Sequence, residues 1–80
     1  MATRFVTLPQ NGDWQLVTSN SDWLIQAMSG TVGIHIGASA PASNAPYHVL
    51  SAGQGLTSVV SGSVYAKSLS NYANSVSVSD

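Results

Sequence analysis

The chain of 80 residues contains no cysteine, no glutamate and only five charged side chains besides its two histidines. Charged residues make up 6% of the sequence, against about 25% in an ordinary globular domain. Without cysteine the chain has no disulfide framework and no thiolate metal site. With one lysine and one arginine it has no basic surface to neutralise phosphates, so the composition argues against nucleic-acid binding.

Long apolar runs are also missing. No stretch approaches the ~20 apolar residues that a membrane-spanning helix needs, so we expect no membrane partner. The start of the chain, Met1–Phe5, is interrupted by Arg4 and has no continuous apolar segment. We therefore expect no secretory signal, and synthesis in the cytoplasm of the producing cell. Disorder is also disfavoured, because 44% of the residues are hydrophobic and few are charged.

Small neutral residues dominate what is present, with 14 serines, nine alanines and nine valines. This mixture favours strands and turns, and the strongest helix formers are scarce. A chain of this length allows one domain, which buries only roughly 60–65% of its unfolded surface and is therefore marginally stable alone. Since disulfides and a metal cluster are missing, partner proteins are the expected source of further stability.

Apolar and polar residues alternate with a period of two along most of the chain. The pattern predicts strands at Thr3–Leu8, Asp13–Thr18, Trp23–Met28, Thr31–Gly37, Tyr47–Ser51, Leu56–Val60, Ser63–Ser68 and Ala73–Ser79. A helix over Ser21–Ser29, capped by Asp22, is the competing interpretation of that segment. The prediction is a single all-β domain over residues 1–80, a small antiparallel β-sandwich or barrel of about seven to eight short strands. Within this domain, residues 1–8 are a candidate for an extended N-terminal arm.

The same alternation assigns faces to the strands. In Asp13–Thr18 it places Trp14, Leu16 and Thr18 on one face, and Trp23–Met28 is apolar on both faces and therefore central. The irregular segment 38–45 is expected to cross from one sheet to the other. The predicted core comprises Phe5, Val6, Trp23, Ile25, Val32, Ile34, Ile36, Val64 and Val76.

The residues that carry chemistry form no convincing site. Two histidines, His35 and His48, without cysteine or glutamate do not make a zinc centre, and His35 is expected on the outer face of its strand. Ser39, His48 and Asp13 make a Ser-His-Asp set on paper, but 14 serines supply such sets by chance. Asp13 and Asp22 each precede a tryptophan and are more simply turn residues than a glycosidase pair. We predict no catalytic, cofactor-binding or metal-binding residue.

The aromatic side chains are the remaining candidates for binding. Tryptophan and tyrosine rings stack on sugars and anchor protein interfaces, whereas Trp23 is better explained by core packing. The charge-poor surface itself predicts coverage by other proteins, because interface centres are depleted of charge. The predicted interface residues, taken from the N-terminal segment, the loop that ends at Pro46 and the tyrosines, are Phe5, Leu8, Pro9, Pro41, Pro46, Tyr47, Tyr65 and Tyr72.

Several segments together resemble small virion proteins of tailed bacteriophages. They are Thr3–Val6, Trp23–Ala27, Val32–Gly37 followed by Pro41, and Val64–Ser68 with Val76–Val78. The resemblance implies a non-enzymatic structural protein of the virion, a capsid decoration or cement protein that binds the major capsid protein or other virion proteins. It also implies a symmetric homo-oligomer, with a trimer favoured. A receptor- or glycan-binding module of a tail fibre or spike is the alternative, and a small hydrolase is the remote one.

Overall fold

The computed structural model describes residues 2–10, 12–57 and 62–80. Within these ranges it contains strands and no helix, which confirms the all-β prediction. The strands are β1 (Thr3–Leu8), β2 (Gln15–Thr18), β3 (Leu24–Ala27), β4 (Thr31–Gly37), β5 (His48–Ser51), β6 (Gly55–Thr57), β7 (Ser63–Ser68) and β8 (Asn74–Ser79). The helical interpretation of Ser21–Ser29 is wrong, because β3 occupies that segment.

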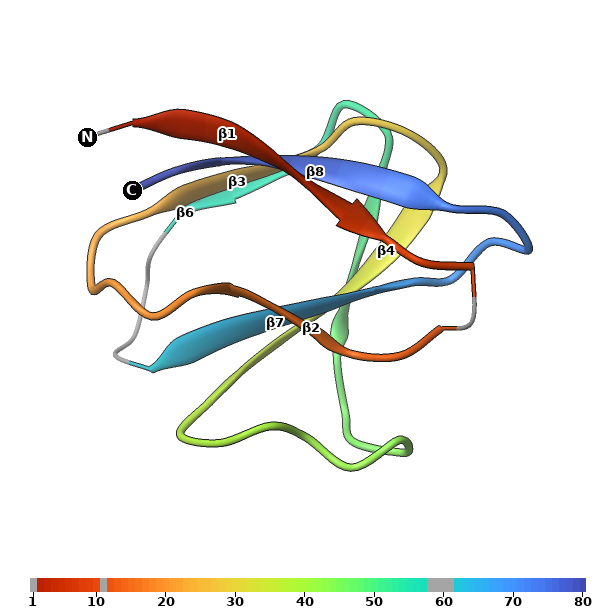
Figure 1. Cartoon of the computed structure of the whole chain (residues 1–80), viewed down its shortest axis with the longest axis horizontal. Coiled ribbons are helices and arrows are strands. Elements are labelled where there is room, and N and C mark those ends of the chain that lie inside the picture. Colours follow the sequence, from red (N-terminus) through yellow and green to blue (C-terminus); the bar gives the residue numbers. More distant parts are fainter. Residues whose placement is uncertain (1, 11, 58–61) are drawn as a thin grey trace.

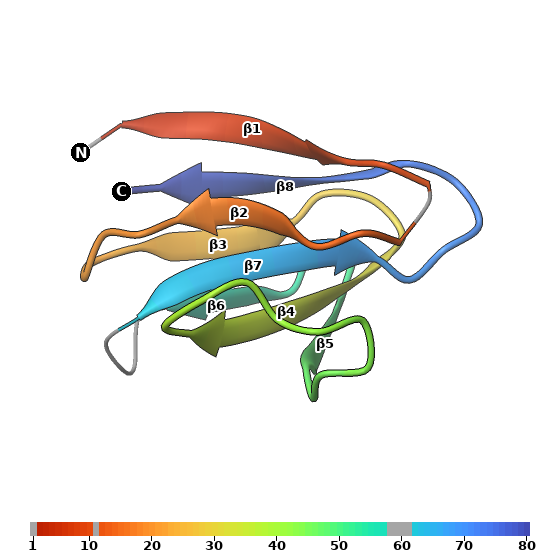
Figure 2. The same cartoon turned by 60° about the horizontal axis from the view of Figure 1, so that its bottom comes forward.

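The strands form two four-stranded antiparallel sheets that pack face to face as a β-sandwich (Figures 1 and 2). Sheet A has the order β1-β8-β3-β6, and sheet B has the order β2-β7-β4-β5. Only the connection from β4 to β5 stays within one sheet, and the other connections cross between the sheets. The predicted strand bounds agree closely with these strands, except at Leu56–Val60, where residues 58–60 lie outside the described part. Because most consecutive strands belong to different sheets, both layers are assembled from short strands around one core.

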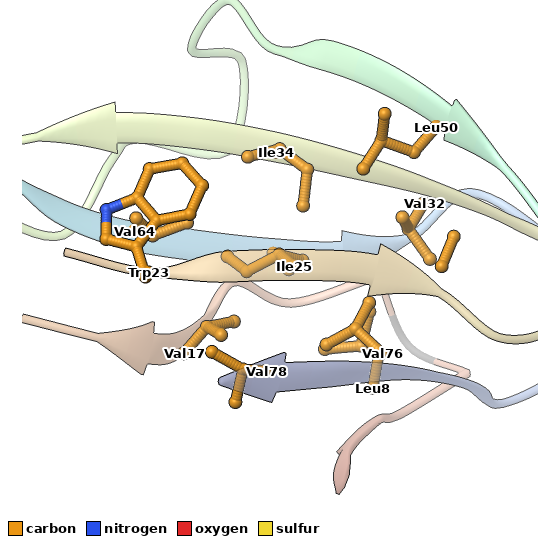
Figure 3. Close-up of a cluster of buried hydrophobic side chains, with 12 residues drawn as sticks. Leu8, Val17, Trp23, Ile25, Val32, Ile34, Leu50, Val64, Val76 and Val78 are labelled. Atoms are coloured by element: carbon orange, nitrogen blue, oxygen red, sulfur yellow. The ribbon is translucent and has the colours of Figure 1, made fainter. Parts of the chain in front are cut away.

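The core lies between the sheets and receives every second residue of most strands (Figure 3). Strand β8 gives the clearest case, because Val76 and Val78 are fully buried while the intervening serines are only half-buried. The buried hydrophobic residues are Leu8, Val17, Trp23, Ile25, Ala27, Val32, Ile34, Leu50, Val64, Ala66, Val76 and Val78. None of them carries a charge, so the interior is stabilised by apolar burial.

The N-terminal strand corrects two predictions. Phe5, expected in the core, is 71% exposed, because Val6 and Leu8 occupy the inward positions of β1 and a strand alternates its faces. Val6 of β1 and Ile36 of β4, which were also predicted in the core, are only partly buried against it. Residues 3–8 are not a free arm, since β1 pairs with β8 along its whole length, from Thr3↔Ser79 to Leu8↔Asn74.

Strands β2 and β3 correct two face assignments. In β2 the register against β7 shifts between Leu16 and Thr18, so Val17 and Thr18 are both buried and Leu16 is exposed. The predicted common face of Trp14, Leu16 and Thr18 is therefore wrong, because a bulge breaks the alternation. Strand β3 does lie centrally, between β8 and β6, but it is buried on one face only.

The segment between β4 and β5 does not cross between the sheets as expected. Both strands belong to sheet B and pair with each other, from Thr31↔Ser51 to Ile34↔His48. The intervening chain is a long loop that returns to the same sheet (Figure 2). This return brings the proline-containing segment near the outer face of sheet B.

Candidate functional site

A group of aromatic and basic side chains gathers on the outer side of sheet B. This Trp14 cluster consists of Trp14, His35, Tyr47 and Lys67. The ring of Trp14 lies 5.8 Å from that of His35 and 6.1 Å from that of Tyr47, centroid to centroid. The ammonium of Lys67 lies 4.7 Å from the Trp14 ring centroid and 4.8 Å from that of Tyr47. Both distances fit cation–π contacts, so the cluster holds one positive charge between two aromatic faces.

The register of sheet B explains why these residues meet. Strand β4 pairs with β7 so that Gly33 lies opposite Lys67 and His35 lies opposite Tyr65. Residues that pair directly share a face, and the opposite face is filled by the core. Gly33 lies beneath the tyrosine ring, and a Cβ there would lie 3.0 Å from Cδ2 of Tyr47, so the ring would have to shift to admit a larger residue. The missing side chain therefore lets the Tyr47 ring rest on the sheet.

Three hydrogen bonds fasten the β4–β5 loop to this cluster. Trp14 Nε1 donates to the carbonyl of Ala42 at 3.2 Å, and Lys67 Nζ donates to that of Ser43 at 3.4 Å. His35 Nδ1 lies 2.8 Å from the carbonyl oxygen of Pro46. The loop is thus held by side chains from β4, from β7 and from the segment before β2. It covers part of the outer face of sheet B, while Tyr47 remains 43% exposed.

An ion pair joins the ends of β1 and β8. Arg4 Nη1 donates to Asp80 Oδ1, Arg4 Nη2 donates to the carbonyl of Val17, and Thr18 Oγ1 donates to Asp80 Oδ2. The bonds from Arg4 and then from Thr18 hold the pKa of the Asp80 carboxyl below its ordinary value of 3.8. These contacts connect β1 and β8 of sheet A to β2 of sheet B.

Removing the Arg4 charge should therefore give a pH-dependent loss of stability. Because the pKa of Asp80 is lowered on folding, its stabilising effect is present above 3.8 and is lost as the pH falls through the lower folded value. We expect Arg4→Gln to lower the urea midpoint at about pH 6 and to show a smaller difference from wild type at about pH 2. An equal difference at both pH values would assign the whole effect to the bond with Val17.

The structure separates the predicted interface residues by exposure. Phe5, Pro46, Tyr47 and Tyr72 are exposed, whereas Pro9, Pro41 and Tyr65 are half-buried. Leu8 is fully buried, so its side chain is in the core of the sandwich and offers no surface to a partner. Four further exposed apolar side chains were not predicted, namely Leu16, Leu24, Met28 and Val49. Strict alternation around the buried Ile25 would have identified Leu24, because neighbours in a strand face opposite sides.

The structure does not arrange the residues of the catalytic sets considered from the sequence as catalysis would require. Ser39 and His48 are exposed, and among the described residues no hydrogen bond joins them. Asp13 precedes β2 and Asp22 follows it, so the two carboxylates flank opposite ends of one strand. A nucleophile must contact its base, and a glycosidase pair must flank one bond. Neither arrangement is seen here.

The part of the chain that the structure describes contains neither a metal-binding cluster nor a membrane-spanning helix. Within residues 2–10, 12–57 and 62–80, no three histidine, aspartate or glutamate side chains are grouped to hold a metal ion. The same residues contain no helix long and apolar enough to cross a membrane.

Comparison of the chain with protein-family models, curated proteins and solved structures gave no match.

Proposed function

We propose that this chain is a non-enzymatic structural protein of a tailed-phage virion that works as a capsid decoration protein and binds neighbouring capsid subunits. The observation that carries the proposal is the exposure of large apolar side chains on a chain with only five charged residues. Among the residues that the structure describes, seven such side chains are 43–71% exposed: Phe5, Leu16, Leu24, Met28, Tyr47, Val49 and Tyr72. Protein interfaces combine these same two properties, few charges and many large apolar or aromatic groups.

The shape of the molecule supports the same role. Its Cα atoms extend over 30 × 25 × 15 Å, so the sandwich is a thin plate with two broad faces. Exposed apolar residues occur in both sheets, for example Phe5 in sheet A and Val49 in sheet B. A plate with an apolar group on each broad face suits a protein that is held between neighbours.

Capsid binding is the direct test of this proposal. We expect the purified protein to sediment with mature capsids of the phage that encodes it, to saturate at a fixed ratio to the capsid protein, and to raise the temperature at which the capsids rupture. Bovine serum albumin mixed with the same capsids controls for trapping in the pellet. Failure to bind immature and mature capsids alike would contradict the decoration role.

The Trp14 cluster favours a second candidate, a glycan- or receptor-binding module of a fibre or spike. Aromatic rings beside a basic group can stack on a sugar and bind its hydroxyls. In this case a glycan titration of the isolated protein should show saturable binding that Tyr47→Ala removes. Tyr72→Ala is the matched control, because Tyr72 is a similarly exposed tyrosine in the turn between β7 and β8. Saturable glycan binding without capsid binding would favour this candidate over decoration.

A further inference from the structure

Strand β1 forms an edge of sheet A. In the strand order β1-β8-β3-β6 it comes first, so it pairs with β8 on one side only. Figure 2 shows β1 as the outermost strand of its sheet, with β8 beside it. An edge strand carries backbone N–H and C=O groups along its free side, and another strand can pair with these groups.

The pairing with β8 shows which backbone groups of β1 face the free side. The amide N of Asp80 donates to the carbonyl of Ala2 at 3.1 Å, and the register of the two strands, continued by one residue, places Ala2 and Asp80 directly opposite each other. Hydrogen-bonded and non-hydrogen-bonded pairs alternate along an antiparallel ladder. The residues of β1 whose N–H and C=O groups point away from β8 are therefore Thr3, Phe5 and Thr7.

The neighbouring edge strand of sheet B is protected in ways that β1 is not. Strand β2 has a register shift between Leu16 and Thr18, and the carbonyl of Val17 already accepts a hydrogen bond from Arg4 Nη2 at 2.6 Å. A bulge and an engaged carbonyl both interrupt the row of groups that an added strand needs. Strand β1 pairs regularly along its whole length and contains no proline. Its free edge is therefore regular enough to accept another strand.

The side chains of β1 are arranged symmetrically about Phe5. Thr3 and Thr7 lie two residues before and after it, on the same face of the strand. An antiparallel copy of β1 centred on Phe5 places Phe5 opposite the partner's Phe5, and Thr3 opposite the partner's Thr7. Aromatic pairs and threonine pairs stabilise antiparallel strands in these positions. Each opposite pair also exchanges two backbone hydrogen bonds, because all three residues point their backbone groups to the free side.

The charge on β1 does not oppose this pairing. Arg4 alternates to the inner side of the strand, where its guanidinium is bonded to Asp80 and to the carbonyl of Val17. In the register centred on Phe5, Arg4 lies opposite the partner's Val6. The positive charge is thus neutralised within each copy and does not face its equivalent directly.

We propose that the free edge of β1 is a self-pairing surface and that its occupant is β1 of a second copy of the chain, added antiparallel about a two-fold axis at Phe5. A foreign strand would satisfy the same backbone groups, but the match of side chains in both directions is a property of β1 paired with itself. Each copy contributes the same edge, so the contact closes at two copies. The inference predicts a dimer instead of the trimer favoured by the sequence, and it does not depend on the decoration role.

Charges placed on the two threonines test both the edge and its register. Thr3 and Thr7 are exposed, so charged side chains there do not enter the core. Thr3→Lys combined with Thr7→Lys puts like charges opposite each other and should weaken dimerisation about tenfold or more. Thr3→Glu combined with Thr7→Glu should have the same effect. An equimolar mixture of these two double variants should dimerise at least as tightly as wild type, because every lysine then lies opposite a glutamate.

Sedimentation equilibrium of the purified proteins at neutral pH measures these differences. A contact one strand wide is weak, so we expect wild type to move from the 8.2 kDa mass of one chain toward twice that mass as its concentration rises from the micromolar to the millimolar range. Met28→Lys combined with Thr57→Lys is the matched control. It adds the same charge at exposed positions near β3 and β6, away from β1, and should dimerise like wild type. Circular dichroism checks that each variant keeps its strands.

Three results would overturn the inference. The first is a wild-type protein that stays monomeric at all concentrations. The second is a β1 double-lysine variant that associates like wild type, which would move the contact to another surface. The third is a mixture of the oppositely charged variants that stays monomeric, because Thr3 and Thr7 would then not face each other. Capsid sedimentation tests the decoration proposal separately, since a monomer that binds capsids refutes only the dimer and a dimer that does not bind them refutes only decoration.

Discussion

Replacing Ile25 by alanine should lower the free energy of unfolding by about 2–5 kcal/mol. Ile25 lies in β3 between β8 and β6, and it is fully buried in the core. The substitution removes apolar surface and leaves a cavity that the central strand of sheet A cannot easily close. A domain of this size has a total stability of only about 5–15 kcal/mol or less, so the loss is a large share of it. Urea denaturation monitored by tryptophan fluorescence measures the change.

Leu16→Ala provides the comparison for Ile25→Ala. It removes the same number of carbon atoms from a strand residue that is exposed, and it should change stability by less than about 1 kcal/mol. The pair therefore separates burial from side-chain size. Equal losses at the two positions would mean that Ile25 is not part of a packed core.

Gly30→Ala should also destabilise the protein, by about 3 kcal/mol or more. Gly30 has a φ of +61°, a left-handed conformation that is unfavourable for alanine. A Cβ at this position would lie within 2.8 Å of three side-chain atoms of Asn74. Asn74 cannot move away easily, because it is buried and its Nδ2 donates to the carbonyl of Thr31 and to the hydroxyl of Ser68. Thermal unfolding followed by circular dichroism measures the effect.

Gly53→Ala isolates the contribution of the backbone conformation. Gly53 has a φ of +90°, but a Cβ added there would meet no atom within 4 Å, so its substitution adds strain without a clash. We expect a loss of about 1–2 kcal/mol there. The difference between the two variants measures the contact with Asn74. If both variants lose the same stability, the clash is relieved by movement and the buried Asn74 network is not rigid.

Burial follows the local sequence pattern in some strands and departs from it in others. In β8 the pattern Val-Ser-Val-Ser identifies the buried and half-buried residues correctly. In β1 the hydrophobicity of Phe5 suggests core packing. Because Val6 and Leu8 occupy the inward positions of the alternating strand, Phe5 faces outward. In β2 the bulge near Val17 reverses the faces, and no residue in the sequence marks its position. Alternation is therefore reliable only where the pairing is regular.

The candidate sites depend on contacts between distant segments. Trp14, His35, Tyr47 and Lys67 come from four parts of the chain, and no motif joins them. They meet because β4 pairs with both β7 and β5 and because the loop returns to the same sheet. The Arg4–Asp80 ion pair likewise forms only because β1 and β8 lie side by side, although its two residues are 76 positions apart in the chain.

The amino-acid order alone was sufficient for the all-β class, for the approximate places of the strands and for a surface poor in charge, because these follow from composition and from neighbours in the chain. Folding determined which sheet each strand joins, where the bulge falls and which apolar side chains stay in water. Strand pairing is a long-range choice, set by how two layers close over a common core, and short alternating segments of similar composition do not encode it locally.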